Sequence, residues 1–158
     1  MNAAEIQTAL DNVFDQALLY HGYTDYMRDY ELVVHAVSDQ RTGIPPAYLR
    51  YLFRNCVEAD IRSALSARTW RASLDDRLID HQMRREQGFV WGVRWQELYP
   101  GGKVIEGSER AREYAKTIGI DFHEIRIKAN AHVITLVVAN LEVSQLDLGY
   151  TPFVLRAE

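Results

Sequence analysis

The sequence predicts a single α+β domain over residues 1–158, dominated by antiparallel strands in a curved β-sheet or a β-sandwich. Two observations support this fold class. Over several segments, apolar and polar side chains alternate with a period of two, which is the pattern of a half-buried strand. Most connections between these segments have hairpin length, which favours antiparallel over parallel pairing. The chain length of 158 residues fits one domain that buries its own core.

Two segments have the residue spacing of an amphipathic helix. Residues 3–19 place apolar side chains at three- and four-residue steps, which predicts an N-terminal helix packed on the sheet rather than a helix that binds a partner. A second helix is expected near residues 108–118, with Ser108 as its N-cap and Gly119 ending it in the left-handed conformation. A short helix near residues 73–80 is compatible with the Ser-Leu-Asp-Asp sequence there.

Six segments have the alternating pattern of strands. They are residues 28–37, 48–62, 89–95, 122–128, 132–139 and 141–146. Asn55-Cys56 interrupts the second of these segments, which predicts a kink, a bulge or a turn between two strands. Residues 132–139 are apolar on both faces, so this strand is expected to lie at the centre of a sheet.

Composition argues against several classes of function. The net charge of −4 at pH 7 argues against nucleic-acid binding, which usually needs a basic domain. No apolar run approaches the ~20 residues that span a membrane, and the N-terminus lacks the pattern of a signal peptide. Cys56 is the only cysteine, so no disulfide can form within the chain. A cytoplasmic protein with a buried structural thiol is therefore expected.

No motif predicts a catalytic residue, a metal site or a cofactor. The five histidines do not have the spacing of zinc ligands. His123 and Glu124 are neighbours on an expected strand, so their side chains point to opposite faces. Gly101-Gly102-Lys103 lacks the ending of a phosphate-binding loop, and the chain has no Gly-x-Ser-x-Gly elbow.

The densest aromatic stretch is FVWGVRWQELYPGG, from Phe89 to Gly102. Trp91 and Trp95 lie on the same face of the expected strand, where they either pack in the core or form part of a binding surface. Tryptophan, tyrosine and arginine contribute much of the energy at protein interfaces. The candidates for an aromatic binding surface are Tyr23, Trp91, Trp95 and Tyr99.

Acidic side chains gather in two segments of the chain. They supply the candidates for partner binding, which are Asp25, Asp29, Glu31, Asp75, Asp76 and Asp80. The first three lie among tyrosines, where an ion-paired strand edge is favoured over carboxylates poised for acid–base chemistry. Such acidic groups would complement a basic partner, and association through them would weaken with salt.

Four blocks of this sequence resemble one protein family. The blocks are HGYTDYMRDYELVV at 21–34, YLFRNCVEADIRSAL at 51–65, GFVWGVRWQELYPGG at 88–102 and GIDFHEIRIKANAHVITLVVANLEV at 119–143. Together they resemble the YxiG-like proteins, an uncharacterised bacterial family. The resemblance implies no catalytic residues. It implies a genomic context beside polymorphic toxins, where small acidic α+β proteins of the cytoplasm are often immunity proteins.

These observations favour a non-enzymatic, cytoplasmic protein-binding domain that acts as a monomer or a homodimer. A more specific hypothesis is that the chain is an immunity protein that neutralises a basic polymorphic toxin. The alternative is a small-ligand-binding protein or an enzyme with an aromatic-lined pocket, which would show a concave site with converging polar groups. A structural, self-associating module is a third interpretation, and a long unpaired strand edge would favour it. Nucleic acid and membrane are not expected as partners.

Overall fold

The computed structural model describes residues 1–24, 27–37, 45–67, 71 and 96–152. In chain order its helices and strands are α1 (Ala3–Asp11), β1 (Ala17–Tyr23), β2 (Tyr30–Ala36), β3 (Ala47–Arg54), β4 (Glu58–Ser63), β5 (Gln96–Glu97), β6 (Gly101–Ile105), α3 (Glu109–Ile118), β7 (His123–Lys128), β8 (His132–Val138) and β9 (Asn140–Gln145).

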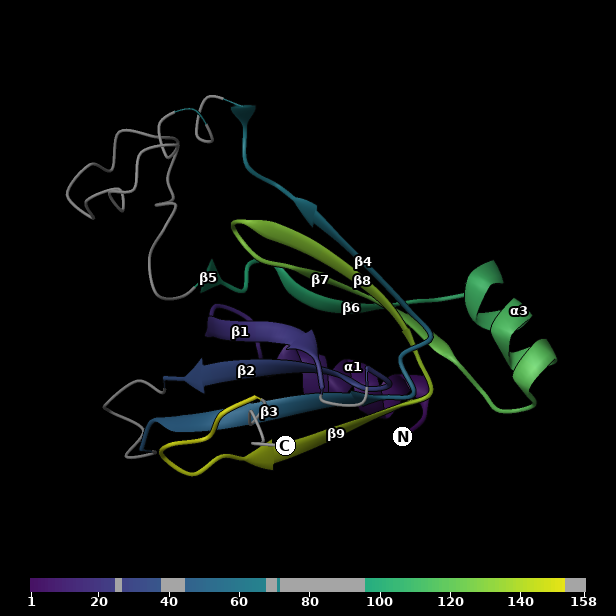
Figure 1. Cartoon of the computed structure of the whole chain (residues 1–158), viewed down its shortest axis with the longest axis horizontal. Helices are drawn as coiled ribbons and strands as arrows, with labels where there is room; N and C mark the ends of the chain where they lie inside the picture. The colour runs from purple at the N-terminus through teal and green to yellow at the C-terminus, as the bar shows by residue number, and fades with distance from the viewer. Residues whose placement is uncertain (25–26, 38–44, 68–70, 72–95, 153–158) are drawn as a thin grey trace, which may run out of the picture.

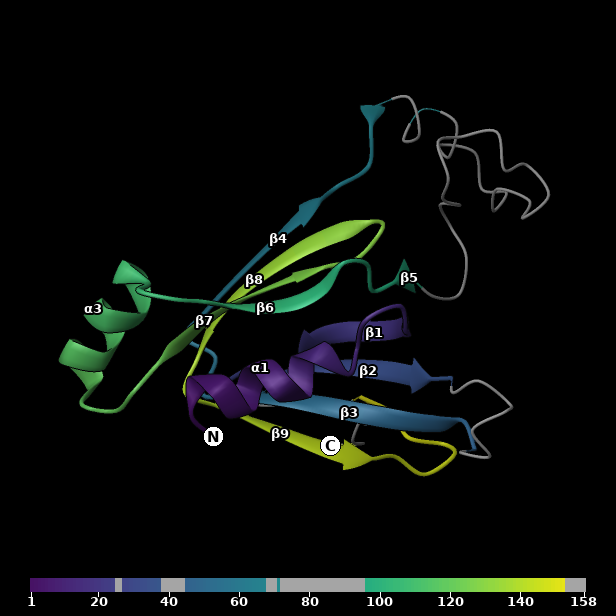
Figure 2. The ribbon, with the colours of Figure 1, turned by 180° about the vertical axis from the view of Figure 1, so that it is seen from behind.

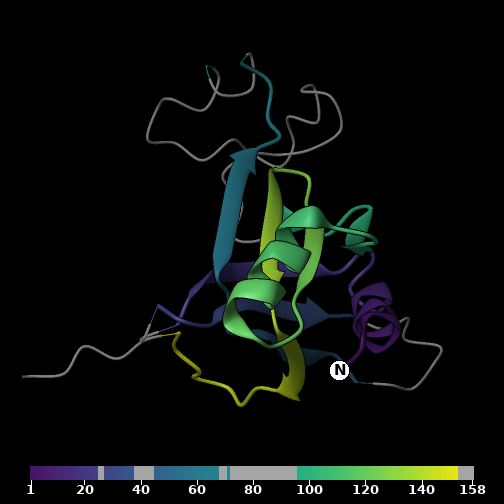
Figure 3. The ribbon, with the colours of Figure 1, turned by 90° about the vertical axis from the view of Figure 1, so that its right-hand side faces the viewer.

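Two antiparallel sheets enclose one hydrophobic core (Figure 1). Within the described residues, the first sheet has the order β5-β1-β2-β3-β9 and the second has the order β4-β8-β7-β6. The sheets are linked at one end by the β3–β4 and β8–β9 connections, and the strands of the second sheet cross those of the first (Figure 3). Leu32, Phe53, Ile125 and Leu136 are fully buried between them. The predicted α+β class, rich in antiparallel sheet, is confirmed.

Helix α1 closes one side of the space between the sheets (Figure 2). Its start is capped reciprocally, because the Glu5 backbone N–H donates to Asn2 Oδ1 at 3.0 Å and the Asn2 N–H donates to Glu5 Oε2 at 2.7 Å. Ile6 and Leu10 lie one helical turn apart and are fully buried. The helix therefore packs against its own domain, as its apolar stripe predicts.

The predicted extent of the first helix, residues 3–19, is wrong. The helix ends at Asp11, and Ala17–Tyr23 forms strand β1. Asp15 has a φ of 62°, a left-handed conformation that a helix cannot continue through. The Asp15 N–H donates to Leu98 O at 2.8 Å, and the Leu98 N–H donates to Gln16 O at 2.9 Å. These contacts with a distant segment redirect the chain, and local periodicity could not show them.

The interruption predicted at Asn55-Cys56 is confirmed as a turn that passes the chain from one sheet to the other. Asn55 has a φ of 50°, β3 lies in the first sheet, and β4 pairs with β8 in the second. The predicted central position of β8 is also confirmed, since β8 lies between β4 and β7.

Helix α3 confirms both predicted ends of the second helix. The Ala111 N–H donates to Ser108 Oγ at 3.1 Å, and Gly119 has a φ of 87°. Ala111 packs with Phe122 and Val137 in a small cluster on the face of the second sheet that points away from the main core. Among the described elements, α3 covers one end of that face (Figure 3).

Strand β6 is missing from the six strand segments that the sequence predicts. In the structure the strand begins at Gly101 and pairs with β7 through Ile105. The predicted strand over residues 89–95 and the short helix near residues 73–80 lie outside the described residues. The strands predicted over residues 122–128, 132–139 and 141–146 correspond to β7, β8 and β9.

Candidate functional site

A groove runs between the first two turns of α1 and the outer edge of β6. Its volume is about 860 Å³, and most of its wall is apolar. The residues that line it are Ala3, Ala4, Gln7, Pro100, Gly101, Gly102, Lys103, Val104, Ile105, Glu106, Arg126 and Lys128. We call this hollow the α1–β6 groove.

The side chain of Gln7 joins the two walls of the groove. Gln7 Nε2 donates to Gly102 O at 3.2 Å, and the Val104 N–H donates to Gln7 Oε1 at 2.8 Å. One amide therefore satisfies two outward-facing backbone groups of an edge strand. A β-carbon on Gly102 would lie 2.9 Å from Leu10 Cδ2, so glycine is needed for α1 to approach this closely. The walls are thus fixed in place before any ligand arrives.

An exposed aromatic pair lies at one end of the groove. The rings of Phe14 and Tyr99 have centroids 5.6 Å apart, and the two residues are 49% and 59% exposed. Gly101 lines the groove and lies next to Phe14, since a β-carbon placed on Gly101 would be 3.5 Å from Phe14 Cα. Two adjacent aromatic side chains that remain half exposed form an apolar surface of the kind found at protein interfaces.

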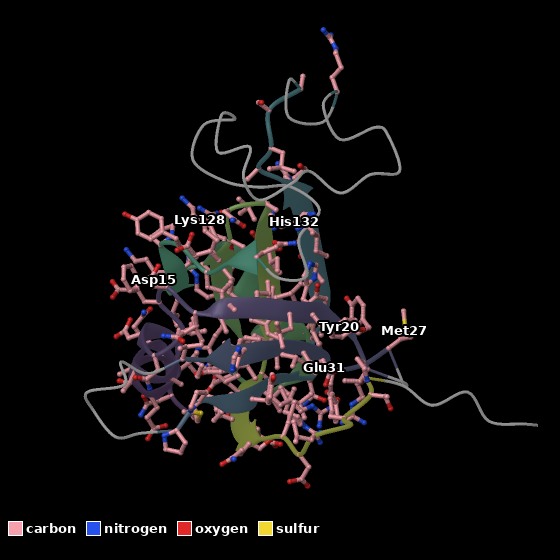
Figure 4. All side chains as sticks on the ribbon, turned by 90° about the vertical axis from the view of Figure 1, so that its left-hand side faces the viewer. Asp15, Tyr20, Met27, Glu31, Lys128 and His132 are labelled. Carbon is pink, nitrogen blue, oxygen red and sulfur yellow. The ribbon has the colours of Figure 1, made fainter. Side chains whose placement is uncertain are left out.

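Cationic side chains project from the open face of the second sheet, beside the groove. Lys103 on β6 is directly opposite Arg126 on β7, and Lys128 lies two residues along on the same face. We call these three residues the cationic row. All three border the α1–β6 groove. Arg126 and Lys128 also line a polar hollow of about 340 Å³, together with Asp60, Arg62, Arg110, Glu124, Val133 and Thr135. Figure 4 shows Lys128 and His132 toward the same end of this sheet.

Ion pairing separates the cations of this face into two kinds. Arg62 Nη2 lies 2.8 Å from Asp60 Oδ2, and Arg110 Nη1 lies 2.8 Å from Glu58 Oε1. In the described part of the chain, the cationic row has no carboxylate partner. The row therefore presents three positive charges that no carboxylate of the described residues pairs with.

Glu31, a predicted partner-binding residue, is fully buried and does not reach the surface. Its carboxylate accepts from Arg50 Nε and from the Tyr150 hydroxyl, at 3.0 Å and 2.8 Å to its two oxygens. Burial and the hydrogen bond to Glu31 raise the pKa of Tyr150 to about 12. The carboxylate thus fastens the segment after β9 onto the first sheet. Figure 4 shows Glu31 on that sheet.

Asp29, a second predicted partner-binding residue, is also engaged within the chain. Its Oδ2 lies 3.0 Å from Arg54 Nη1, and its Oδ1 accepts from the Asn55 N–H at 2.8 Å. The aspartate fixes the turn that connects the two sheets. It fits the alternative interpretation of an ion-paired strand edge better than a free acidic contact. Asp25, Asp75, Asp76 and Asp80 lie outside the described residues.

The aromatic candidates have different positions in the structure. Tyr99 is exposed at the end of the α1–β6 groove, whereas Tyr23 is half-buried and packs edge-on against Tyr30 with ring centroids 5.2 Å apart. Trp91 and Trp95 lie outside the described residues. Sequence reasoning missed Phe14, which it placed in the apolar stripe of a longer helix, and it missed the cationic row. Strand register joins those three cations, and no local pattern shows that register.

Cys56 has the structural role that the sequence predicts. Its thiol is buried and donates to Glu58 O at 3.2 Å. Burial raises the pKa of this thiol to about 11, which leaves little reactive thiolate at neutral pH.

Two histidines meet between the sheets. The rings of His21 and His132 have centroids 5.5 Å apart, and His21 Nδ1 lies 2.6 Å from the Tyr30 hydroxyl. The amide of Gln96 bonds to His132 Nδ1 at 2.9 Å. Burial lowers the pKa of both histidines, and the charge on His132 lowers that of His21 further.

These lowered pKa values predict a loss of stability in mild acid. Below a pH of about 6.5 the unfolded chain takes up protons on these histidines that the folded chain resists, so the free energy of unfolding falls as the pH falls. Urea denaturation between about pH 7.5 and pH 5.5 measures the effect, and this window lies above the range in which most carboxylates titrate. His21→Gln should reduce the slope, and a free energy that stays constant over this window would contradict the prediction.

Two features are absent from the described residues. No helix among them has the length and apolar character needed to cross a membrane. No group of three or more His, Cys, Asp or Glu side chains among them is placed to hold a metal ion.

Comparison with known proteins identifies a family match. The sequence model of a family described as YxiG-like protein matches residues 2–156. No match was found among curated proteins. One similar solved structure is the crystal structure of an uncharacterized protein from Neisseria gonorrhoeae. It shares 11% sequence identity at a TM-score of 0.38, and the match covers 84% of this chain and 93% of that one.

Proposed function

We propose that this chain, which belongs to the YxiG-like protein family, is a non-enzymatic protein-binding domain whose contact surface is the α1–β6 groove with the Phe14–Tyr99 pair. One observation carries the proposal: two aromatic rings about half exposed at the end of an apolar groove with fixed walls. Aromatic side chains near the centre of an interface supply much of the binding energy, and fixed walls reduce the entropy lost on association.

The positions of the reactive side chains support a binding role over a catalytic one. The Cys56 thiol is buried and has a raised pKa, whereas a nucleophilic cysteine needs a lowered pKa. His21 is bonded to Tyr30 and His132 to Gln96, in the space between the sheets. These side chains stabilise the contact between strands of different sheets, and they lie apart from the α1–β6 groove.

The more specific proposal is an immunity protein that acts in the cytoplasm, as a monomer or a homodimer, by covering a toxin. This follows from the resemblance to the family. An interface centred on Glu31 and Asp29 is not favoured, because both carboxylates are engaged within the chain. The α1–β6 groove is a better contact surface for such a partner, because its apolar wall and aromatic end are open to solvent.

Affinity capture with matched variants tests the proposed function. The wild-type chain and the double variant Phe14→Ser/Tyr99→Ser are immobilised and exposed to lysate of the native host. We expect a protein that is recovered with the wild type and lost with the double variant. That protein, once purified, should bind the wild-type chain directly in isothermal titration calorimetry.

The matched control is Ile118→Ser/Ile120→Ser. These isoleucines are 50% and 46% exposed, and they line a separate hollow with Met27 and Phe122. The control should retain the partner, because it removes a similar apolar area elsewhere. If the control loses the partner and Phe14→Ser/Tyr99→Ser retains it, the interface lies at that other hollow and the assignment to the α1–β6 groove is wrong.

A further inference from the structure

We infer that the partner places an acidic segment on the cationic row, next to the apolar contact at the α1–β6 groove. This inference rests on the proposed function and adds the chemistry of the partner. It reverses the charge expected from the sequence, whose acidic candidates pointed to a basic partner. Lys103, Arg126 and Lys128 carry the inference, because all three line the groove and two of them, Arg126 and Lys128, also line the polar hollow.

The strand register places like charges together. Lys103 and Arg126 are directly opposite on β6 and β7, and Lys128 follows on the same face. Like charges in directly opposed positions destabilise a sheet. In the described residues none of these three cations forms an ion pair with a carboxylate, whereas Asp60 pairs with Arg62 and Glu58 pairs with Arg110 on the same face. Placing these cations together costs stability in the free protein. An anionic partner that relieves their repulsion would explain why they are present.

The geometry fits carboxylates on an extended segment. The cationic row borders the groove, so one ligand segment can place apolar side chains in the groove and acidic side chains on the row. Arg126 offers a planar fork that can bind a carboxylate with two hydrogen bonds, and the two lysines add mobile charges around it. The acidic residues Asp15 and Glu97 lie near the aromatic end of the groove, where the neighbouring Asp15 carboxyl and burial raise the pKa of Glu97. Carboxylates of the partner are therefore expected beyond that end, over the cationic row.

An acidic protein segment is favoured over a nucleic acid. The chain has a net charge of −4, and the three cations of the row are fewer than the roughly six to ten phosphate contacts of a typical DNA-binding protein. The apolar groove beside the row also suits aliphatic side chains better than a phosphate backbone.

A labelled peptide of alternating Leu and Glu, measured by fluorescence anisotropy, is the test. We expect it to bind the wild-type chain, and we expect Lys128→Glu to weaken binding by about tenfold or more. The matched control is Lys116→Glu on α3, an exposed lysine whose reversal changes the net charge equally. The control should bind the peptide as the wild type does at moderate salt, where charges far from the site are screened.

A second variant separates a binding role from a structural one. Lys103→Glu places a carboxylate opposite Arg126 and so converts the repulsive pair into an attractive one. We expect the midpoint of thermal unfolding to rise by about 1–3 °C while peptide binding falls by about tenfold. If Lys103 served only to stabilise the fold, its replacement would not raise the midpoint of thermal unfolding while weakening peptide binding.

Three outcomes of the peptide experiment would overturn the inference. They are failure of the Leu-Glu peptide to bind, equal or tighter binding of the corresponding Leu-Lys peptide, and tighter binding of a single-stranded oligonucleotide. The proposed function is tested separately, since Phe14→Ser/Tyr99→Ser addresses the apolar contact and Lys128→Glu addresses the charge. If capture of the protein partner depends on the aromatic pair and is unaffected by Lys128→Glu, the binding function stands and the acidic chemistry of the partner is refuted.

Discussion

Replacing Glu31 with Ala is expected to lower the free energy of unfolding by about 3 kcal/mol, measured by urea denaturation at neutral pH. Glu31 is fully buried on β2, where it accepts hydrogen bonds from Arg50 and Tyr150. Its removal leaves the Arg50 guanidinium, which is 26% exposed, without a carboxylate, and it releases the Tyr150 hydroxyl. The segment after β9 then loses its anchor on the first sheet.

Two control variants separate charge from packing. Tyr150→Phe removes one hydroxyl and should cost about 1–2 kcal/mol. The double variant Glu31→Leu/Arg50→Met removes both charges and replaces them with apolar side chains of similar size. It should recover much of the loss, because a buried ion pair and a well-packed apolar pair differ little in stability. A loss below about 0.5 kcal/mol for Glu31→Ala would show that the carboxylate is dispensable to the fold.

The double variant Phe14→Ser/Tyr99→Ser is expected to weaken binding of the purified partner by about thirtyfold or more, which corresponds to about 2 kcal/mol. The two rings are tilted by 53° with centroids 5.6 Å apart, and each is about half exposed in the free chain, so a partner that covers them gains apolar burial from both. Isothermal titration calorimetry gives the affinity. The loss should arise mainly from faster dissociation.

The thermal stability of Phe14→Ser/Tyr99→Ser shows whether a loss of affinity comes from the lost contact or from unfolding of the chain. Because the rings are partly exposed, we expect the thermal midpoint to fall by only about 2–4 °C. Ile118→Ser/Ile120→Ser should leave the affinity within about twofold of the wild type. An affinity unchanged by loss of the aromatic pair would place the partner on another surface of the chain.

The sequence predicts strands best where side chains alternate over a whole element and helices best where caps are present. Ser108 and Gly119 define α3 because the signals at both ends are local. Asn55 marks the passage from β3 to β4 for the same reason, since a polar side chain tolerates the left-handed conformation of this turn. The N-terminal helix is shorter than predicted because Asp15 and Gln16 bond to Leu98, which lies far along the chain.

The binding surface could be predicted only in part. Tyr99 stands out in the sequence because it belongs to an aromatic stretch, and the structure places it at the α1–β6 groove. Its partner Phe14 is distant in sequence, so the pair exists only after folding. Glu31 could not be recognised as a buried residue for a related reason: its distance from Tyr150 along the chain hides their hydrogen bond. Charge counted along the sequence cannot distinguish a buried, satisfied carboxylate from a free one.

Site-specific photocrosslinking in living cells tests the central claim most directly. A benzophenone amino acid is introduced separately at position 14, at position 99 and, as the control, at position 118. The account predicts one and the same protein adduct from positions 14 and 99 and none from position 118, although Ile118 is as exposed as Phe14. An adduct from position 118 without one from either aromatic position would contradict binding at the α1–β6 groove.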